Sequence, residues 1–105
     1  MSIDITTNVT RANAPVTGSP IAVQLDLMSQ QEARAYGGAQ AGEGPYFRYE
    51  GYTLAAITLQ QGDLLTDTVN RDQLGNYKKY RIIGDPEPFP LDGHTEFVVD
   101  RVIGT

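Results

Sequence analysis

Hydrophobic and polar residues alternate along much of this chain. The clearest alternation covers residues 21–28, where one face carries only aliphatic side chains: Ile21, Val23, Leu25 and Leu27. A weaker alternation at the start of the chain places three apolar side chains on one face: Ile3, Ile5 and Val9. A period of two residues is that of a strand with one buried and one exposed side. Both segments are therefore predicted to be half-buried β-strands.

Four later segments are also predicted to be strands, because they are rich in β-branched and aromatic residues. They cover residues 46–60, 64–69, 77–83 and 95–103. Gly51 interrupts the first of them, which indicates a bulge or a bend. The last is apolar on both faces at its centre, which indicates a central strand that is buried on both sides.

Proline and glycine mark the connections between these strands. Residues 11–20 contain two prolines and a glycine, and we expect a flexible arm there rather than a tight hairpin turn. Residues 61–63, Gln-Gly-Asp, predict a turn, and residues 70–76 predict a hairpin connection. Residues 84–93 hold three prolines at alternate positions, which force an extended loop or a strand at the edge of a sheet.

The segment between residues 29 and 46 combines a possible helix with a glycine-rich loop. Ser29 followed by Glu32 matches a capping box, so residues 29–38 are the one place for a helix, of about two turns. Residues 37–45 read GGAQAGEGP, a composition that favours neither helix nor sheet. We therefore expect a long glycine-rich loop at residues 32–46, and its length makes it a candidate functional element.

Together these patterns predict a mainly β fold. The expected architecture is a small antiparallel β-barrel, or alternatively a sandwich, with long loops and at most one short helix. The length of the chain fits a single β domain spanning residues 1–105.

The acidic charge balance argues against a nucleic-acid or anionic membrane partner. Eight basic and thirteen acidic residues give a net charge of −5, whereas binding through nucleic-acid phosphates or to an anionic membrane needs a basic face. The chain contains no Cys, which excludes disulfides, thiolate catalysis and thiolate metal sites. The start of the chain lacks the basic and apolar regions of a signal peptide, so we expect a soluble cytosolic protein.

His94, the only histidine, is the one indication of metal chemistry. In an extended strand Asp92, His94 and Glu96 point the same way, but Gly93 introduces a turn and no second His or Cys completes a familiar ligand set. The serines lie in none of the turns that activate a nucleophile. The glycine-rich loop lacks the Lys-Ser/Thr pair of a phosphate-binding loop. We therefore predict no catalytic residue, no metal, no cofactor and no enzymatic activity.

An aromatic cluster follows the glycine-rich loop: Tyr46, Phe47, Tyr49 and Tyr52. Aromatic side chains on a strand can stack single-stranded bases, but Arg48 is the only basic residue beside them and the chain is acidic. Packing in the core or between subunits is the better interpretation.

The order of these features resembles that of the head-closure, or stopper, proteins of the head-to-tail connector in long-tailed bacteriophages and gene transfer agents. The resemblance covers most of the chain. It rests on the layout of strands, arm and variable loop, and on two short signals: Gln61-Gly62-Asp63-Leu64-Leu65 and Tyr80-Arg81-Ile82-Ile83.

This resemblance implies a virion protein of the phage neck, assembled in the host cytoplasm. It implies a small β-barrel in a ring of about twelve copies that lies between the portal adaptor and the tail and closes the head. In that family a loop projects into the channel and gates packaged DNA, which passes without sequence-specific binding; no membrane is involved. The matching segment here is residues 32–46, and the channel-loop candidates are Gly37, Gly38, Gln40, Gly42, Glu43, Gly44 and Pro45. The candidates for contacts between subunits are Arg11, Asn13, Pro15, Tyr46, Tyr49 and Tyr52.

Two other classes of function remain open from the sequence. One is a different phage structural role, such as a tail terminator or a capsid decoration protein. The other is a soluble ligand-binding β-barrel with the aromatic cluster lining its site. The oligomeric state separates the phage structural roles from the ligand-binding barrel, because a ligand-binding barrel can be a stable monomer.

Overall fold

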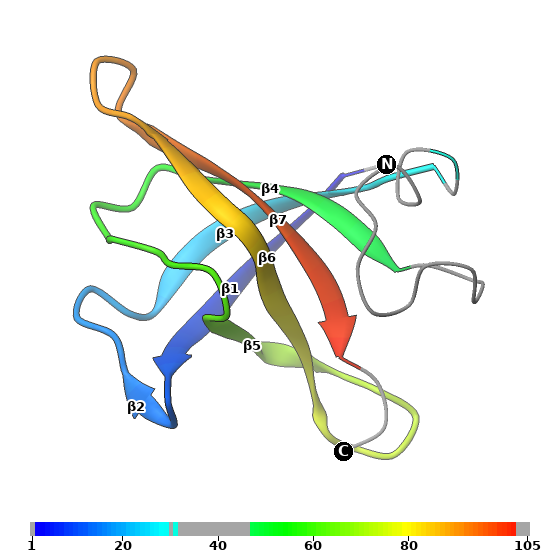
Figure 1. Cartoon of the computed structure of the whole chain (residues 1–105). Coiled ribbons are helices and arrows are strands. Elements are labelled where there is room, and N and C mark those ends of the chain that lie inside the picture. The colour runs from blue at the N-terminus through cyan, green and yellow to red at the C-terminus, as the bar shows by residue number, and fades with distance from the viewer. Residues whose placement is uncertain (1, 30, 32–46, 103–105) are drawn as a thin grey trace.

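The computed structural model describes residues 2–29, 31 and 47–102. Its strands are β1 (Ser2–Arg11), β2 (Ala14–Pro15), β3 (Ile21–Leu27), β4 (Arg48–Thr53), β5 (Leu64–Arg71), β6 (Tyr77–Phe89) and β7 (His94–Val102) (Figure 1). Every paired strand is antiparallel to its neighbour. The expected helix at residues 29–38 and the expected loop at residues 32–46 lie, apart from Ser29 and Gln31, outside the described residues.

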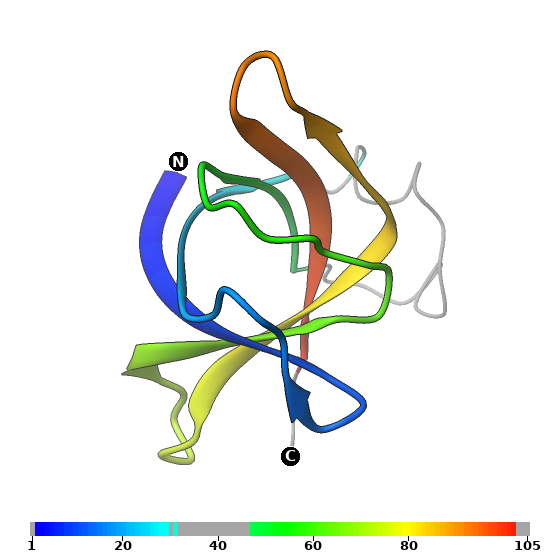
Figure 2. The same cartoon turned by 90° about the vertical axis from the view of Figure 1, so that its left-hand side faces the viewer.

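Six of the strands form a closed barrel, and β2 is an addition to its edge. The strands follow one another in the order β1-β3-β4-β7-β6-β5, and β5 then pairs with β1 from Thr7↔Asp67 to Thr10↔Leu64. Figure 2 shows the chain winding around the barrel, with the hairpins extending beyond it. The prediction of a mainly β barrel is confirmed, and the sandwich alternative is wrong because the sheet closes on itself.

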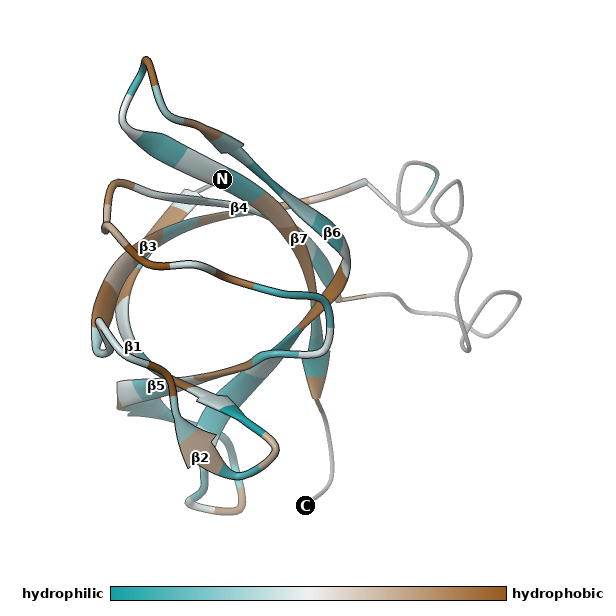
Figure 3. Cartoon of the chain, turned by 60° about the vertical axis from the view of Figure 1, so that its left-hand side comes forward, coloured by the Kyte–Doolittle hydropathy of each residue, from teal (hydrophilic) through white to brown (hydrophobic). Residues whose placement is uncertain are grey.

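The barrel is closed around a packed apolar interior. Alternate residues of the strands point inward, and Figure 3 shows hydrophobic positions recurring among hydrophilic ones around the wall. The inward side chains are at most 8% exposed. They form one cluster: Ile5, Val9, Ile21, Val23, Leu25, Ile57, Leu59, Leu65, Tyr80, Ile82, Phe97 and Val99. This cluster confirms the two predicted half-buried strands, except at two positions. Ile3, expected on the apolar face of the first strand, is 37% exposed near the start of β1. The second exception lies in β3.

That exception is Leu27, which was expected in the core but is 48% exposed, whereas Met28 is buried at 4%. The backbone N–H of Met28 donates to the carbonyl of Arg48 at 2.8 Å, and its side chain packs against Val98 outside the main core. The alternation stops here because β3 ends at Leu27, and Met28 packs in a second, smaller apolar cluster.

The β1–β2 connection is a tight hairpin turn and not the flexible arm expected at residues 11–20 from their composition. Ala12 and Asn13 have φ of 52° and 65°, which is the two-residue turn that matches the twist of antiparallel strands. β2 pairs with β1 through Arg11↔Ala14. The N–H of Val9 then donates to Ser19 Oγ at 2.8 Å, so the following residues are also held against the barrel.

β4 is shorter and more regular than its sequence predicts. It ends at Thr53, whose hydroxyl donates to the Ala22 carbonyl at 2.7 Å and accepts from the Ala55 N–H at 3.1 Å. Gly51 was expected to mark a bulge, but the ladder continues regularly through it. A Cβ on Gly51 would lie 2.2 Å from the Phe97 ring. The glycine therefore serves the close approach of an aromatic ring.

β6 extends six residues beyond its predicted end and reaches Phe89. Its register with β7 shifts between Ile83 and Glu87, and beyond that point β6 pairs with β7 alone. Pro86 and Pro88 therefore lie on a free edge, where a missing N–H breaks no ladder. Of the two expectations for this segment, the strand edge is confirmed.

β7 lies between β4 and β6, as predicted for a central strand. The predicted burial on both sides is wrong, because Glu96 is exposed and Val98 is only half-buried on the outer face. Phe97 and Val99 are buried inside the barrel, and Val98 packs outside it against Met28. The turn predicted at residues 61–63 is also present, with Gly62 at a φ of 91°.

Candidate functional site

Of the residues considered for metal binding, only His94 takes part in an aromatic stack. The His94 ring lies between Tyr52 and Phe89, with ring centroids 4.7 Å and 4.9 Å away. His94 Nε2 is 2.9 Å from Glu96 Oε2, and Asp92 lies in the turn before β7. Within the described ranges, no three His, Asp or Glu side chains converge as metal ligands do. This geometry stabilises a hairpin.

The aromatic cluster divides between two faces of β4. Tyr49 meets the buried Tyr80 ring edge-on at 5.5 Å, and burial raises the pKa of Tyr80 to about 12. Tyr52, three residues on, belongs to the outer face and the His94 stack. Phe47 is 37% exposed, and Tyr46 lies outside the described residues. The cluster is thus not one surface, because odd and even positions of a strand point in opposite directions.

Arg11 holds the β1–β2 hairpin to the turn before β5 through Asp63. Its Nε and Nη2 each donate to an Asp63 carboxylate oxygen at 2.8 Å, and the Gln60 N–H donates to the same group at 2.8 Å. Asp63 is 1% exposed. Burial alone would raise the pKa of Asp63, but the hydrogen bonds from Arg11 and Gln60 outweigh it and hold that pKa below its usual range.

Asn13 and Pro15, the other candidates for subunit contact in this segment, are exposed on the hairpin. Their role between subunits stays a prediction, as does that of Tyr49 and Tyr52. The channel-loop candidates, from Gly37 to Pro45, lie outside the described residues.

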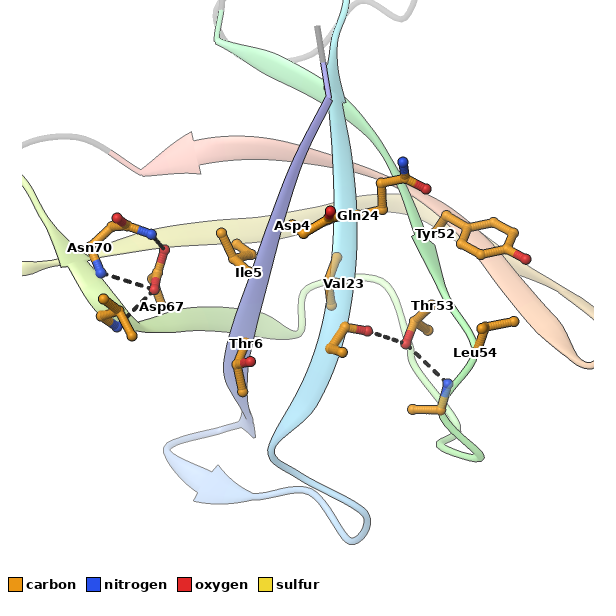
Figure 4. Close-up of a pocket in the computed structure, with 13 residues that line it drawn as sticks. Asp4, Ile5, Thr6, Val23, Gln24, Tyr52, Thr53, Leu54, Asp67 and Asn70 are labelled. Carbon is orange, nitrogen blue, oxygen red and sulfur yellow. Dashed lines mark hydrogen bonds between the residues drawn. The ribbon is translucent and has the colours of Figure 1, made fainter.

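A groove of about 750 Å³ crosses β1 and β3 and continues to the ends of β4 and β5 (Figure 4). Leu54 and Val69 line it and are 68% and 75% exposed. Its buried carboxylate, Asp67, accepts hydrogen bonds from the Val69 N–H and from both nitrogens of Asn70 at 2.8–3.0 Å. These bonds close a local turn and engage both oxygens of Asp67. The lining contains no Lys, Arg or His, so the groove offers no acid–base pair.

A second groove, of about 890 Å³, lies over β3, β4, β6 and β7, and we name it the acidic groove. It is lined by six carboxylates: Asp26, Glu50, Asp85, Glu87, Glu96 and Asp100. Between them lie apolar residues, among them Ile83 and Val98, which are half-buried. The surface can therefore receive a partner that is both basic and apolar.

Arg48 is the only cation among the residues lining the acidic groove. It is 1% exposed, and its Nη2 donates to Asp100 Oδ2 at 2.8 Å in a two-pronged ion pair across β4 and β7. Among the described residues, Asp26, Glu50, Asp85 and Glu87 make no ion pair. Carboxylates therefore outnumber cations six to one in the lining of the acidic groove.

Sequence reasoning missed this groove because its acids are scattered from residue 26 to residue 100. The available signal was weak. Glu96, Val98 and Asp100 alternate with the core residues of β7 and so had to share its outer face. Only the strand order, which brings β3 and β6 to the same side of the barrel, joins them to the other carboxylates.

Comparisons with known proteins identify no relative of this chain. No family model, curated protein or solved structure matches it. No helix in the part of the chain that the structure describes is long and apolar enough to span a membrane.

Proposed function

We propose that this chain is a structural protein of the bacteriophage neck. It forms a ring between the portal adaptor and the tail, closes the filled head and gates the passage of DNA. The observation that carries the proposal is a small closed barrel with a packed interior, which displays its charged and apolar features on the outside. This is the expected design of a component that acts by contacting other proteins.

The same observation disfavours a barrel that encloses a soluble ligand. Such barrels keep space inside, whereas small barrels of structural type fill it with side chains. Here the inward side chains are at most 8% exposed and form a continuous cluster. Both grooves described above have exposed residues in their walls, although the groove across β1 and β3 also reaches the buried residues Ile5 and Val23.

The buried charged groups also have structural partners, whereas the buried Thr7 hydroxyl has none among the described residues. Asp63 binds Arg11, Asp67 caps its own turn and Arg48 binds Asp100. None of these arrangements places a nucleophile beside a base, so we propose a role without catalysis. Residues 32–46 are the proposed channel loop, since glycine permits the change of backbone conformation that a gate requires.

Light scattering after size exclusion and negative-stain electron microscopy of the purified chain test this proposal. Twelve copies of the 11.5-kDa chain weigh about 140 kDa, and we expect rings near that mass. Mixed with phage-like particles that lack this protein, the chain is expected to bind at the neck. Coating of the whole shell would favour a decoration protein, and binding only to free tails would favour a terminator. A monomer that joins no particle would contradict the proposal.

A further inference from the structure

The connection between β5 and β6 carries the opposite charge to the acidic groove, and we name residues 71–79 the basic hairpin. Its cations are Arg71, Lys78 and Lys79. Its only acid, Asp72, accepts the backbone N–H groups of Leu74 at 2.9 Å and Asn76 at 3.0 Å and so serves the turn. Leu74, near the tip, is 77% exposed. The hairpin thus presents an apolar tip flanked by positive charges.

Contacts of Arg71 hold the basic hairpin together from within. Arg71 Nη1 donates to the Gly75 carbonyl, and Nη2 donates to the Tyr77 hydroxyl, each at 2.8 Å. The guanidinium carbon also lies 4.1 Å from the centroid of the Tyr77 ring, a cation–π contact. A surface that is ordered beforehand loses less conformational entropy when it docks.

The acidic groove complements the basic hairpin in both charge and polarity. Its exposed carboxylates can meet Lys79 on the outer face of β6, whereas Lys78 lies on the other face, beside Tyr80. Ile83 and Val98 offer apolar contact for Leu74. Neither Lys78 nor Lys79 makes an ion pair within the described ranges. Opposite charges with an apolar centre are the arrangement found in specific protein interfaces.

The tip of the hairpin and the far half of the groove cannot meet within one molecule, although Lys79 at the base of the hairpin pairs with Val102, two residues from Asp100 of the groove. The hairpin leads into the start of β6, whereas Asp85 and Glu87 lie in its far half. Nine residues of extended strand separate Lys78 from Glu87, which corresponds to about 30 Å. Figures 1 and 2 show the β5–β6 and β6–β7 connections at opposite ends of the molecule. A partner that brings this hairpin to this groove must therefore be a second copy.

We propose that the basic hairpin of one copy docks in the acidic groove of the next. Because the two contact surfaces differ, the contact is head-to-tail and repeats from copy to copy, and it closes into a ring when the rotation permits. This inference rests on the proposed ring and assigns the interface that builds it.

Engineered cysteines test the contact directly, since the chain has none of its own. Leu74→Cys and Glu87→Cys are purified separately, mixed and oxidised. We expect a disulfide-linked pair of the two variants, at least tenfold more abundant than with Leu91→Cys in place of Leu74→Cys. Leu91 is the matched control, because it is the exposed apolar residue of the β6–β7 connection, 102% exposed. Equal cross-linking by Leu91→Cys would overturn the inference.

Charge exchange provides the second test. Lys78→Glu/Lys79→Glu or Asp85→Lys/Glu87→Lys alone is expected to weaken association by roughly tenfold at low salt. The fourfold variant has the net charge of the natural chain and is expected to regain association. If it does not, or if Lys78→Glu/Lys79→Glu leaves association unchanged and lowers binding to a DNA duplex, the hairpin is not the subunit contact.

The two proposals can fail separately. Rings without the Leu74–Glu87 cross-link would overturn this interface and leave the neck protein standing. The cross-link in open chains that never join a particle would support the interface and contradict the neck assignment.

Discussion

The hairpins at the two ends of β6 are built alike but carry opposite charge. In each, a nitrogen-containing side chain stacks on an aromatic ring, Arg71 on Tyr77 in one and His94 on Phe89 in the other. Each also has an exposed leucine at its turn. The basic hairpin is bound by contacts within itself, whereas the β6–β7 hairpin is also anchored to β4, because Tyr52 stacks on His94.

The comparison indicates that, in each hairpin, the stacked side chains set the conformation and other residues set the charge. Stacking orders a short exposed hairpin that would otherwise fray. The outer charges that flank the stack, Lys79 at one end and Asp85 and Glu87 at the other, are then free to define a partner. The anchored hairpin should therefore depend on the barrel, and the self-contained hairpin should not.

The largest effect is expected at Gly51, which lies beside Tyr52 on the strand that anchors the β6–β7 hairpin. In Gly51→Ala the added methyl would meet the Phe97 ring at 2.2–2.6 Å, and we expect a loss of about 2–3 kcal/mol of unfolding free energy in urea titrations. The same substitution in a Phe97→Ala background should cost much less. Equal costs in the two backgrounds would show that the ring is not the cause.

The next effect concerns a third hairpin, β1–β2, which is held by a buried charge. Asp63→Asn is expected to cost on the order of 1–3 kcal/mol at neutral pH, because it removes the charge that binds Arg11. The pKa of Asp63 is lowered in the folded chain from the ordinary value of 3.8. Its stabilisation is therefore complete well above pH 3.8 and is lost as the pH falls through the folded-state pKa.

Thermal unfolding of the natural chain and Asp63→Asn from pH 7 down to pH 2 measures this effect. The difference in Tm should stay constant at neutral pH and narrow below pH 3.8. A difference that widened on acidification would contradict the pKa direction.

The smallest expected losses of stability come from removing the stacked side chain of each hairpin of β6. His94→Ala removes a ring that lies between two others, and we expect a loss of about 1 kcal/mol. Arg71→Ala removes an exposed cation–π contact and should cost about 0.5 kcal/mol. Amide hydrogen exchange should show loosening of β4 beside the hairpin in His94→Ala, but loosening confined to the hairpin in Arg71→Ala. Faster amide exchange in the barrel strands of Arg71→Ala would show that the basic hairpin is not independent of the barrel.

Much of the barrel wall could be predicted from the sequence, because alternation is a local signal. Ile21, Val23 and Leu25 reach the core as their spacing requires. The sequence predictions failed at special backbone positions and at positions that depend on residues far along the chain. Ala12 is a poor candidate for a positive φ on its own, yet it forms a tight turn with Asn13, which tolerates that conformation. Gly51 makes space for a ring 46 residues further along the chain.

The candidate surfaces were harder to predict for the same reason. The ion pair of Arg48 with Asp100 joins residues 52 apart, and the acidic groove exists only because strand order gathers scattered acids. The basic hairpin was visible as a turn with flanking cations, but its complement on another part of the chain was not.

Closure of the barrel through β1 and β5 has a consequence for synthesis on the ribosome. Thr7 to Thr10 must wait for Leu64 to Asp67 before the wall can close, and β4 must wait for β7. The emerging chain therefore exposes unpaired strand edges until its last strand is complete, and pairing over such long separations makes folding slow. Newly made chains thus depend on rapid completion or on chaperones to avoid edge-to-edge aggregation.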